Sequence, residues 1–126
     1  MEVKTSTKEK YHVIRVDTTE LAANMTEELC NKLQQYLKEP VKNLVLNLEN
    51  VKALDEESAE LLVKTQQLFY EQEASFVICC LTPDIERFLD EKDLLELMNS
   101  TPTESEAADI VQMEEIEREL LNEDDQ

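Results

Sequence analysis

The sequence contains no glycine in its 126 residues. Phosphate-binding loops of the P-loop and Rossmann kinds need glycine at fixed positions, so both classes of nucleotide site are excluded. Turns that require a positive φ must instead use asparagine or aspartate, which tolerate the left-handed conformation better than other residues. We expect four asparagines to serve such turns: Asn24, Asn43, Asn50 and Asn99.

Cysteine and histidine are too few for a metal site or a thiol nucleophile. Cys30, Cys79 and Cys80 form an odd set without a CxxC pair, which is a poor framework for disulfides. Neighbouring strand residues point to opposite faces, so Cys79 and Cys80 are expected on opposite faces as small buried hydrophobes. The single histidine, His12, is expected on a strand surface. The sequence therefore predicts no catalytic residue, no metal and no cofactor.

Basic residues are scarce, with 12 against 30 acidic residues and a net charge of −18. Binding to phosphate groups depends on Lys and Arg, so nucleic acid and anionic membranes are excluded as partners. No apolar run approaches the roughly 18 residues of a membrane span, and the first ten residues lack the apolar segment of a signal peptide. We expect a cytoplasmic protein without membrane insertion.

The length and the 41% of hydrophobic residues suit one domain with a core and are too small for two. The charge is uneven, because residues 103–126 contain ten acidic residues and one basic residue, Arg118. We therefore expect one domain over residues 1–102, followed by an acidic C-terminal helix over residues 103–126.

The first part of the chain shows a hairpin pattern and then a helix pattern. Tyr11–Val16 alternates in polarity and predicts a strand, with Val3–Thr7 as its partner strand across the turn at Lys8–Lys10. Asn24 and Glu27 form a capping pattern before an amphipathic helix that Pro40 ends.

The central part predicts a strand, a helix and a second strand. Leu44–Leu48 is a short apolar strand, and Asp55 is the N-cap of a long helix that ends near Glu73. Phe76–Leu81 is apolar throughout, as a central strand covered on both faces would be. This order gives one right-handed βαβ unit.

The last part predicts two further helices. Thr82 and Pro83 suit the N-cap and first position of a short third helix. Leu94–Met98 fits either a helix end or a brief strand. Thr103 and Glu106 form a capping box that opens the final helix.

The apolar positions of the final helix recur at a spacing near 3.5 residues: Ala107, Ile110, Met113, Ile116 and Leu120. This spacing allows packing on the domain or pairing with the same helix of a second copy. We expect packing on the domain, with a frayed end over Asn122–Gln126. The expected state is a monomer or a weak homodimer.

Three carboxylates open the second helix: Asp55, Glu56 and Glu57 precede Ser58. An N-cap aspartate and first-turn glutamates stabilise a helix start by about 0.3–1 kcal/mol each, so these residues need no further role. They are also the one group of chemically similar side chains at a defined structural position, which makes them a candidate docking surface.

The order of the elements resembles the STAS domain of anti-sigma factor antagonists. Three segments carry the likeness, which spans Met1 to about Pro102: YHVIRVD, VKNLVLNLENVKALDEESAELL and SFVICCLTPDIERFLDEKDLLELM. The resemblance implies a single-domain α/β fold with a mixed sheet of four to five strands and about four helices. It also implies a non-enzymatic protein-interaction module that regulates transcription or signalling.

In that family the second helix opens with Asp-Ser-Ser/Thr-Gly, and the matching residues here are Asp55, Glu56, Glu57 and Ser58. The resemblance implies that this segment binds an anti-sigma factor of the serine-kinase type or a related regulator, and that phosphorylation of the first serine abolishes binding. Glu56 occupies that place and cannot accept a phosphoryl group. It is either a fixed approximation of the phosphorylated state or an ordinary first-turn acid. Ser58 is the alternative phosphoacceptor.

Two other functions remain open. The carboxylates, joined by Asp17, could bind Mg²⁺ as in a receiver-like phosphotransfer domain. However, Thr82-Pro83 follows the late strand after which a receiver would have a lysine. The third possibility is a scaffold or accessory subunit of a signalling or transport complex, because a fold does not by itself determine function.

Overall fold

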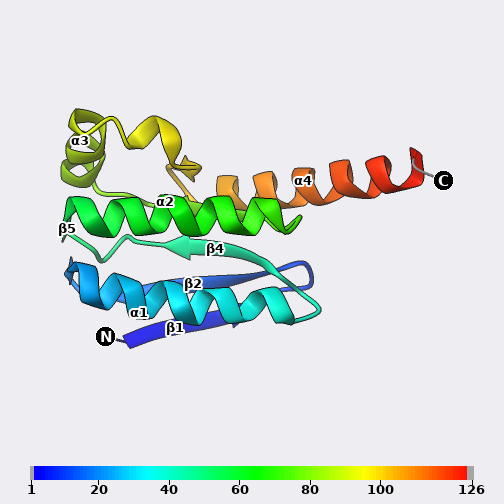
Figure 1. The fold of residues 1–126 in the computed structure, drawn as a ribbon, viewed down its shortest axis with the longest axis horizontal. Helices are drawn as coiled ribbons and strands as arrows, with labels where there is room; N and C mark the ends of the chain where they lie inside the picture. The colour runs from blue at the N-terminus through cyan, green and yellow to red at the C-terminus, as the bar shows by residue number, and fades with distance from the viewer. Residues whose placement is uncertain (1, 125–126) are drawn as a thin grey trace.

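The computed structural model describes residues 2–124 and the side chains of residues 2–122. Its elements are β1 (Glu2–Thr7), β2 (Tyr11–Asp17), β3 (Glu20–Leu21), α1 (Ala23–Gln34), the 3-10 helix η1 (Gln35–Lys38), β4 (Asn43–Asn47), β5 (Ala53–Leu54), α2 (Glu56–Glu71), β6 (Phe76–Cys79), α3 (Pro83–Glu91), the 3-10 helix η2 (Leu95–Leu97), β7 (Ser100–Thr101) and α4 (Glu104–Asp124). Figure 1 shows α1 and α2 side by side in front of the sheet and α4 extending past it. The predicted α/β fold with a mixed sheet is confirmed.

The main sheet has the strand order β1-β2-β4-β6-β7. The predicted hairpin is present, because β1 pairs antiparallel with β2. The pairs β2–β4, β4–β6 and β6–β7 are parallel. A second, two-stranded sheet pairs β3 with β5, so that Leu21 lies opposite Leu54. The small sheet brings the segments that precede α1 and α2 together.

The strands separate two hydrophobic clusters. On one face, Leu44, Leu46 and Ile78 belong to the larger cluster, which also contains the buried side chains of α1, α2 and α3. On the other face, Val45 and Val77 belong to a smaller cluster that is completed from α4 by Ala107 and Val111, both fully buried. The alternation within β4 and β6 therefore places the first turns of α4 on the face opposite the other helices.

A polar network fixes the middle of α4 to the sheet. The Arg118 Nη2 atom donates to Glu115 Oε2 at 2.9 Å, Ser75 Oγ at 3.0 Å and Asn43 Oδ1 at 3.2 Å. Ser75 is fully buried, and its hydroxyl donates to Glu114 at 2.6 Å. Burial alone would raise the pKa of Glu115, but the hydrogen bonds from Arg118 and Asn43 hold that pKa below its ordinary value.

We expect Arg118→Ala to lower the free energy of unfolding by about 1–2 kcal/mol, because several partly buried acceptors lose their donor. The matched control is Arg87→Ala, since Arg87 forms the same kind of i,i+3 pair with Asp84 at 3.3 Å on an exposed surface. That control should cost less than about 0.5 kcal/mol. Urea unfolding measures both values. Equal losses would show that the Arg118 network adds nothing to the attachment of α4.

The capping pattern expected at Asn24 and Glu27 is wrong. Helix α1 begins at Ala23, and its N-cap, Ala22, makes no side-chain cap bond. The Asp55 Oδ2 atom accepts a hydrogen bond from the Ala23 amide at 3.2 Å. A pattern within one segment could not reveal a cap supplied from another segment.

The four asparagines do not supply the positive φ angles that we expected of them. Among the described residues, positive φ occurs at Glu73, Cys80 and Asp93, with values of 59°, 65° and 58°. Glu73 and Asp93 each follow the C-cap of a helix, where glycine is the usual residue. At the end of α2 the next amide, of Ala74, donates to Phe69 O at 2.9 Å and closes a Schellman motif. Glu73 and Asp93 thus occupy positions where glycine is usual, because the ends of α2 and α3 require a positive φ there.

His12 is buried, so its expected place on a strand surface is wrong. Its ring nitrogens lie 2.9 Å from Thr7 Oγ1 and 3.0 Å from the Val41 carbonyl oxygen. Cys79 and Cys80 are not on opposite faces of a strand, because β6 ends at Cys79 and Cys80 is left-handed. Both thiols pack against the cluster under α4, and burial raises the pKa of Cys79.

The segment after α3 and the start of α4 can be compared with the sequence predictions. Leu94–Met98 contains a 3-10 turn, η2, and the strand β7 follows it at Ser100–Thr101. The expected N-cap of the final helix is present, because the Thr103 hydroxyl oxygen accepts from the Glu106 amide at 3.1 Å. Fraying is expected over Asn122–Gln126; the backbone is helical to Asp124, and the last two residues lie outside the described part of the chain.

Candidate functional site

The start of α2 lies at one end of the molecule, beside the start of α1. The loop after β2 and the loop before α2 are joined by backbone hydrogen bonds, including Lys52 N to Thr19 O at 2.8 Å and Asp55 N to Leu21 O at 3.3 Å. These bonds continue the small β3–β5 sheet toward the helix start. The first turn of α2 is therefore held against the segment that leads into α1.

Asp55 caps both helices with one carboxylate. Its Oδ1 atom accepts from the Ser58 amide at 2.8 Å, as predicted for the N-cap of α2, and its Oδ2 atom accepts from the Ala23 amide at the start of α1. Hydrogen bonds from Ser58, and then from Ala23, lower the pKa of the exposed Asp55 carboxyl. The charged form of Asp55 thus stabilises two helix starts at once.

Ser58 lies behind this carboxylate and has no exposed surface. Its hydroxyl donates to the Leu21 carbonyl oxygen at 3.1 Å, and the Thr26 hydroxyl donates to it at 2.7 Å. The sequence analysis did not identify Thr26, because no local pattern connects a residue of α1 with the first turn of α2. The buried hydroxyl pair joins the two helices just inside the shared cap.

Glu56 and Glu57 point outward from the same turn, and both are exposed. The Glu56 Oε2 atom lies 3.9 Å from Nζ of Lys92, which follows α3, and both side chains are about half exposed. An exposed pair at this distance contributes little to stability. The two glutamates are thus available to a partner, whereas Asp55 is engaged in capping.

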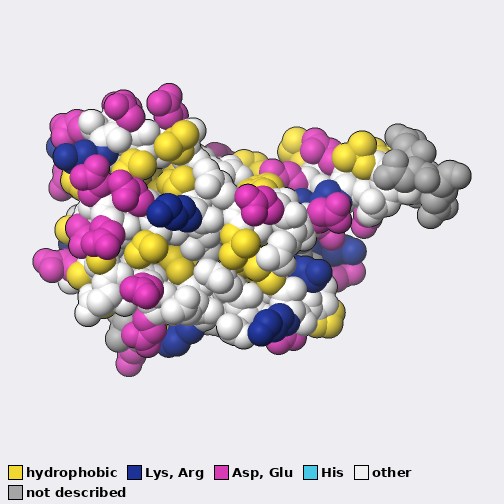
Figure 2. Space-filling model, viewed as in Figure 1, with side chains coloured by type: hydrophobic (Ala, Val, Ile, Leu, Met, Phe, Trp, Pro, Cys, Tyr) yellow, Lys and Arg dark blue, Asp and Glu magenta, His cyan; other side chains and the backbone are white. Residues whose placement is uncertain are grey.

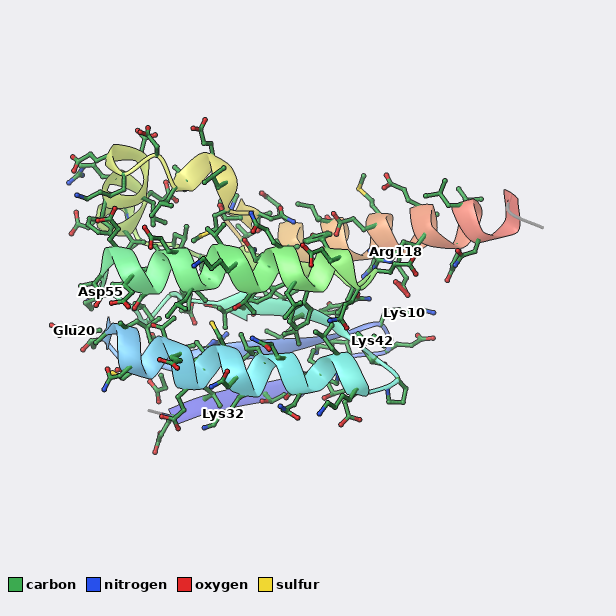
Figure 3. The ribbon with its side chains drawn as sticks, viewed as in Figure 1. Lys10, Glu20, Lys32, Lys42, Asp55 and Arg118 are labelled. Atoms are coloured by element: carbon green, nitrogen blue, oxygen red, sulfur yellow. The ribbon has the colours of Figure 1, made fainter. Side chains whose placement is uncertain are left out.

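Acidic side chains gather at the end of the molecule where α2 begins, with Lys92 beside Glu56. Figure 3 shows Asp55 at the same end as Glu20, whereas Lys10, Lys42 and Arg118 lie at the other end, near α4. A partner that approaches the start of α2 therefore meets exposed carboxylates with the half-exposed Lys92 beside them. Exposed carboxylates at a helix start suit a docking surface better than an enclosed catalytic pocket, which would be concave and mostly apolar.

The magnesium alternative finds no support in the donor set. Within residues 2–122, no three His, Cys, Asp or Glu side chains are grouped closely enough to hold a metal ion. Hydrogen bonds already occupy both oxygens of Asp55.

In the described part of the chain, no helix combines the length and apolar character needed to cross a membrane.

Comparison with known proteins identifies relatives of the fold. A sequence model of the STAS domain family matches residues 3–107. A variant of Moorella thermoacetica RsbS with a serine replaced by glutamate is similar, with a TM-score of 0.72 and 18% identity over 89% of this chain and 96% of that chain. An anti-sigma factor antagonist from Mycobacterium paratuberculosis has a TM-score of 0.71 and 19% identity over 88% of this chain and 93% of that chain. The phosphorylated form of the Bacillus cell fate determinant SpoIIAA has a TM-score of 0.62 and 18% identity over 87% of this chain and 99% of that chain.

Proposed function

The chain belongs to the STAS domain family, and from this we propose that it is a non-enzymatic protein-interaction module that regulates transcription or signalling. Its proposed docking surface is the start of α2, formed by Asp55, Glu56 and Glu57. The similarity to anti-sigma factor antagonists supports an anti-sigma factor of the serine-kinase type, or a related regulator, as the partner. The exposed carboxylates beside the shared cap support docking at this place.

One observation carries the mechanistic part of the proposal: the first turn of α2 exposes carboxylates and buries its one hydroxyl. Glu56 stands at the phosphoacceptor place of the family resemblance and is exposed, whereas Ser58 has no accessible surface. A phosphoserine carries about −1.5 to −2 charges at neutral pH, and a glutamate carries about half of that permanently. We propose that the surface works with a fixed charge, without serine phosphorylation, and that its partner is a regulator that presents basic residues to this charge.

The position of Ser58 argues against its use as a moved phosphoacceptor. A kinase would have to reach an oxygen that is hydrogen-bonded to Leu21 and Thr26 behind the cap of Asp55. Reaching it would require the first turn of α2 to separate from α1. We therefore propose a structural role for the Ser58 hydroxyl, as the inner link between the two helices.

The test is to restore the hydroxyl in Glu56→Ser, with Glu57→Ser as the matched control on the same exposed turn. After incubation with ATP and a serine kinase encoded near the gene, we expect mass spectrometry to find phosphate on the Glu56→Ser variant and none on residues 55–58 of the wild type. We also expect Glu56→Ser to change the affinity for the partner by about tenfold, equivalent to 1.4 kcal/mol.

The control separates a fixed phosphate-like charge from a first-turn acid. If Glu56 acts only on the helix, Glu56→Ser and Glu57→Ser should change partner affinity equally and by less than about twofold. Equal effects would therefore contradict the proposed role of Glu56. Phosphate on Ser58 of the wild type would contradict the structural role of that hydroxyl.

A further inference from the structure

The outer face of α4 carries an apolar stripe in solvent. Met113, Ile116 and Leu120 are 59%, 56% and 56% exposed, and their spacing of three and four residues places them on one face of the helix. Leu121, next to the stripe, is 63% exposed. Four of the five exposed large hydrophobic side chains in the described structure thus belong to this helix. A concentration of apolar surface of this kind marks an interaction site.

The domain leaves the stripe largely exposed, and only Ile116 lines a hollow shared with the β1–β2 turn. Ala107 and Val111 face the sheet, and the polar bonds of Arg118 hold the same side of α4 against Asn43 and Ser75. The stripe occupies the side turned away from these contacts. Figure 1 shows the last turns of α4 extending past the sheet, and Figure 2 shows hydrophobic and acidic side chains side by side on this projecting part. The family match also ends at residue 107, before the stripe begins.

Most of the charges beside the stripe are negative, although Lys8 and Lys10 of the β1–β2 turn line a hollow with Ile116 and Glu119. Glu117 and Glu119 flank it, and the sequence of α4 contains only one basic residue, Arg118. Arg118 is bonded to Glu115 and to the domain, so it offers no cation to a partner. Two copies of this helix would bring acidic flanks together, which is unfavourable for helix pairing. A helix with Lys or Arg beside its apolar positions would instead match the stripe in shape and in charge.

We propose that the stripe of Met113, Ile116 and Leu120 is a docking surface for an amphipathic helix of a partner protein with basic residues beside its apolar face. This surface is separate from the start of α2, because Asp55 and Arg118 lie at opposite ends of the molecule (Figure 3). Occupation of one surface leaves the other accessible. The protein therefore has one surface for its regulatory partner and a second that attaches it to a basic helix.

The probe is a synthetic amphipathic peptide of about 18 residues, long enough to form a helix, with leucine on one face and lysine on the flanks. Its binding to the full-length protein is measured by fluorescence anisotropy at about 0.15 M salt, where weak surface attraction is screened. We expect saturable binding that Ile116→Ser with Leu120→Ser weakens at least about tenfold, because the apolar contact is lost without a change in charge. Glu117→Gln with Glu119→Gln should weaken it by about threefold.

Two controls keep the result specific. Leu97→Ser removes another exposed side chain, 58% accessible on η2, and should leave binding unchanged. Glu56→Ser should also leave it unchanged, which separates this surface from the proposed function at α2. Equal binding of the peptide to wild type and to the Ile116→Ser, Leu120→Ser variant would overturn the proposal, because only net charge would then act. A wild-type dimer that this variant dissociates in sedimentation would also overturn it and assign the stripe to a second copy.

Discussion

The variant Ser58→Asp is expected to lose more than about 3 kcal/mol of unfolding free energy, because a charge would be buried without a cationic partner. The side chain of Ser58 is fully buried between Leu21 and Thr26. A carboxylate there would face the Leu21 carbonyl oxygen, which accepts a hydrogen bond from the Ser58 hydroxyl in the wild type. The favourable interaction with the helix dipole is at most about 1–2 kcal/mol and does not offset this loss. Urea unfolding followed by circular dichroism measures the difference.

Two further variants separate charge from the loss of the hydroxyl. Ser58→Ala removes the bonds to Leu21 and Thr26 and should cost about 1–3 kcal/mol, less than the aspartate. Glu57→Asp shortens a carboxylate on the exposed part of the same turn and should change stability by less than about 0.5 kcal/mol. If Ser58→Asp is as stable as the wild type, the first turn of α2 tolerates a negative group at this hydroxyl. Phosphorylation at Ser58 would then be compatible with the fold.

The variant Asp55→Ala is expected to lose about 2 kcal/mol of unfolding free energy, because two helices lose their cap together. This value is at the upper end of the range for one N-cap. Asp55 Oδ1 serves α2 through the Ser58 amide, and Oδ2 serves α1 through the Ala23 amide. Asp55→Asn keeps one acceptor oxygen and should lose about half as much. If alanine and asparagine are equally destabilising, the effect lies in the charge rather than in the shared geometry.

The contribution of Asp55 should also depend on pH. Its pKa is lowered in the folded state from the ordinary value of 3.8, first by the hydrogen bonds of Ser58. A group with a lowered folded pKa stabilises the protein above its unfolded pKa and loses that contribution as the pH falls through the folded pKa. The stability difference between wild type and Asp55→Asn should therefore be complete near pH 7 and shrink below about pH 4. A difference that grows in acid would contradict the assignment.

The helix starts show which parts of the site could be predicted. Asp55 and Thr82 were identified as N-caps because a cap and the amide that it serves lie three residues apart in the chain. The cap of α1 could not be found in this way, since its carboxylate comes from the start of α2. The pattern at Asn24 and Glu27 met the local rule, and the tertiary contact placed the helix start elsewhere.

The same distinction applies to exposure. Alternation in Tyr11–Val16 predicted a strand, but the buried position of His12 depends on Val41, which lies 29 residues further along the chain. The spacing of Ile116 and Leu120 predicted an apolar face on the last helix. Whether the domain covers that face depends on how far α4 extends past the sheet (Figure 1).

The sequence by itself determined the α/β pattern, the negative charge and the carboxylates at the start of α2, because periodicity, charge and capping act over a few neighbouring residues. Only the tertiary structure decided that one carboxylate of Asp55 caps two helices, that Ser58 is buried and that the stripe on α4 is exposed. Those features arise from contacts between segments distant in the chain. The sequence between two such segments does not specify how they meet. The packing of α1, α2 and α4 on the sheet determines which of these segments come into contact.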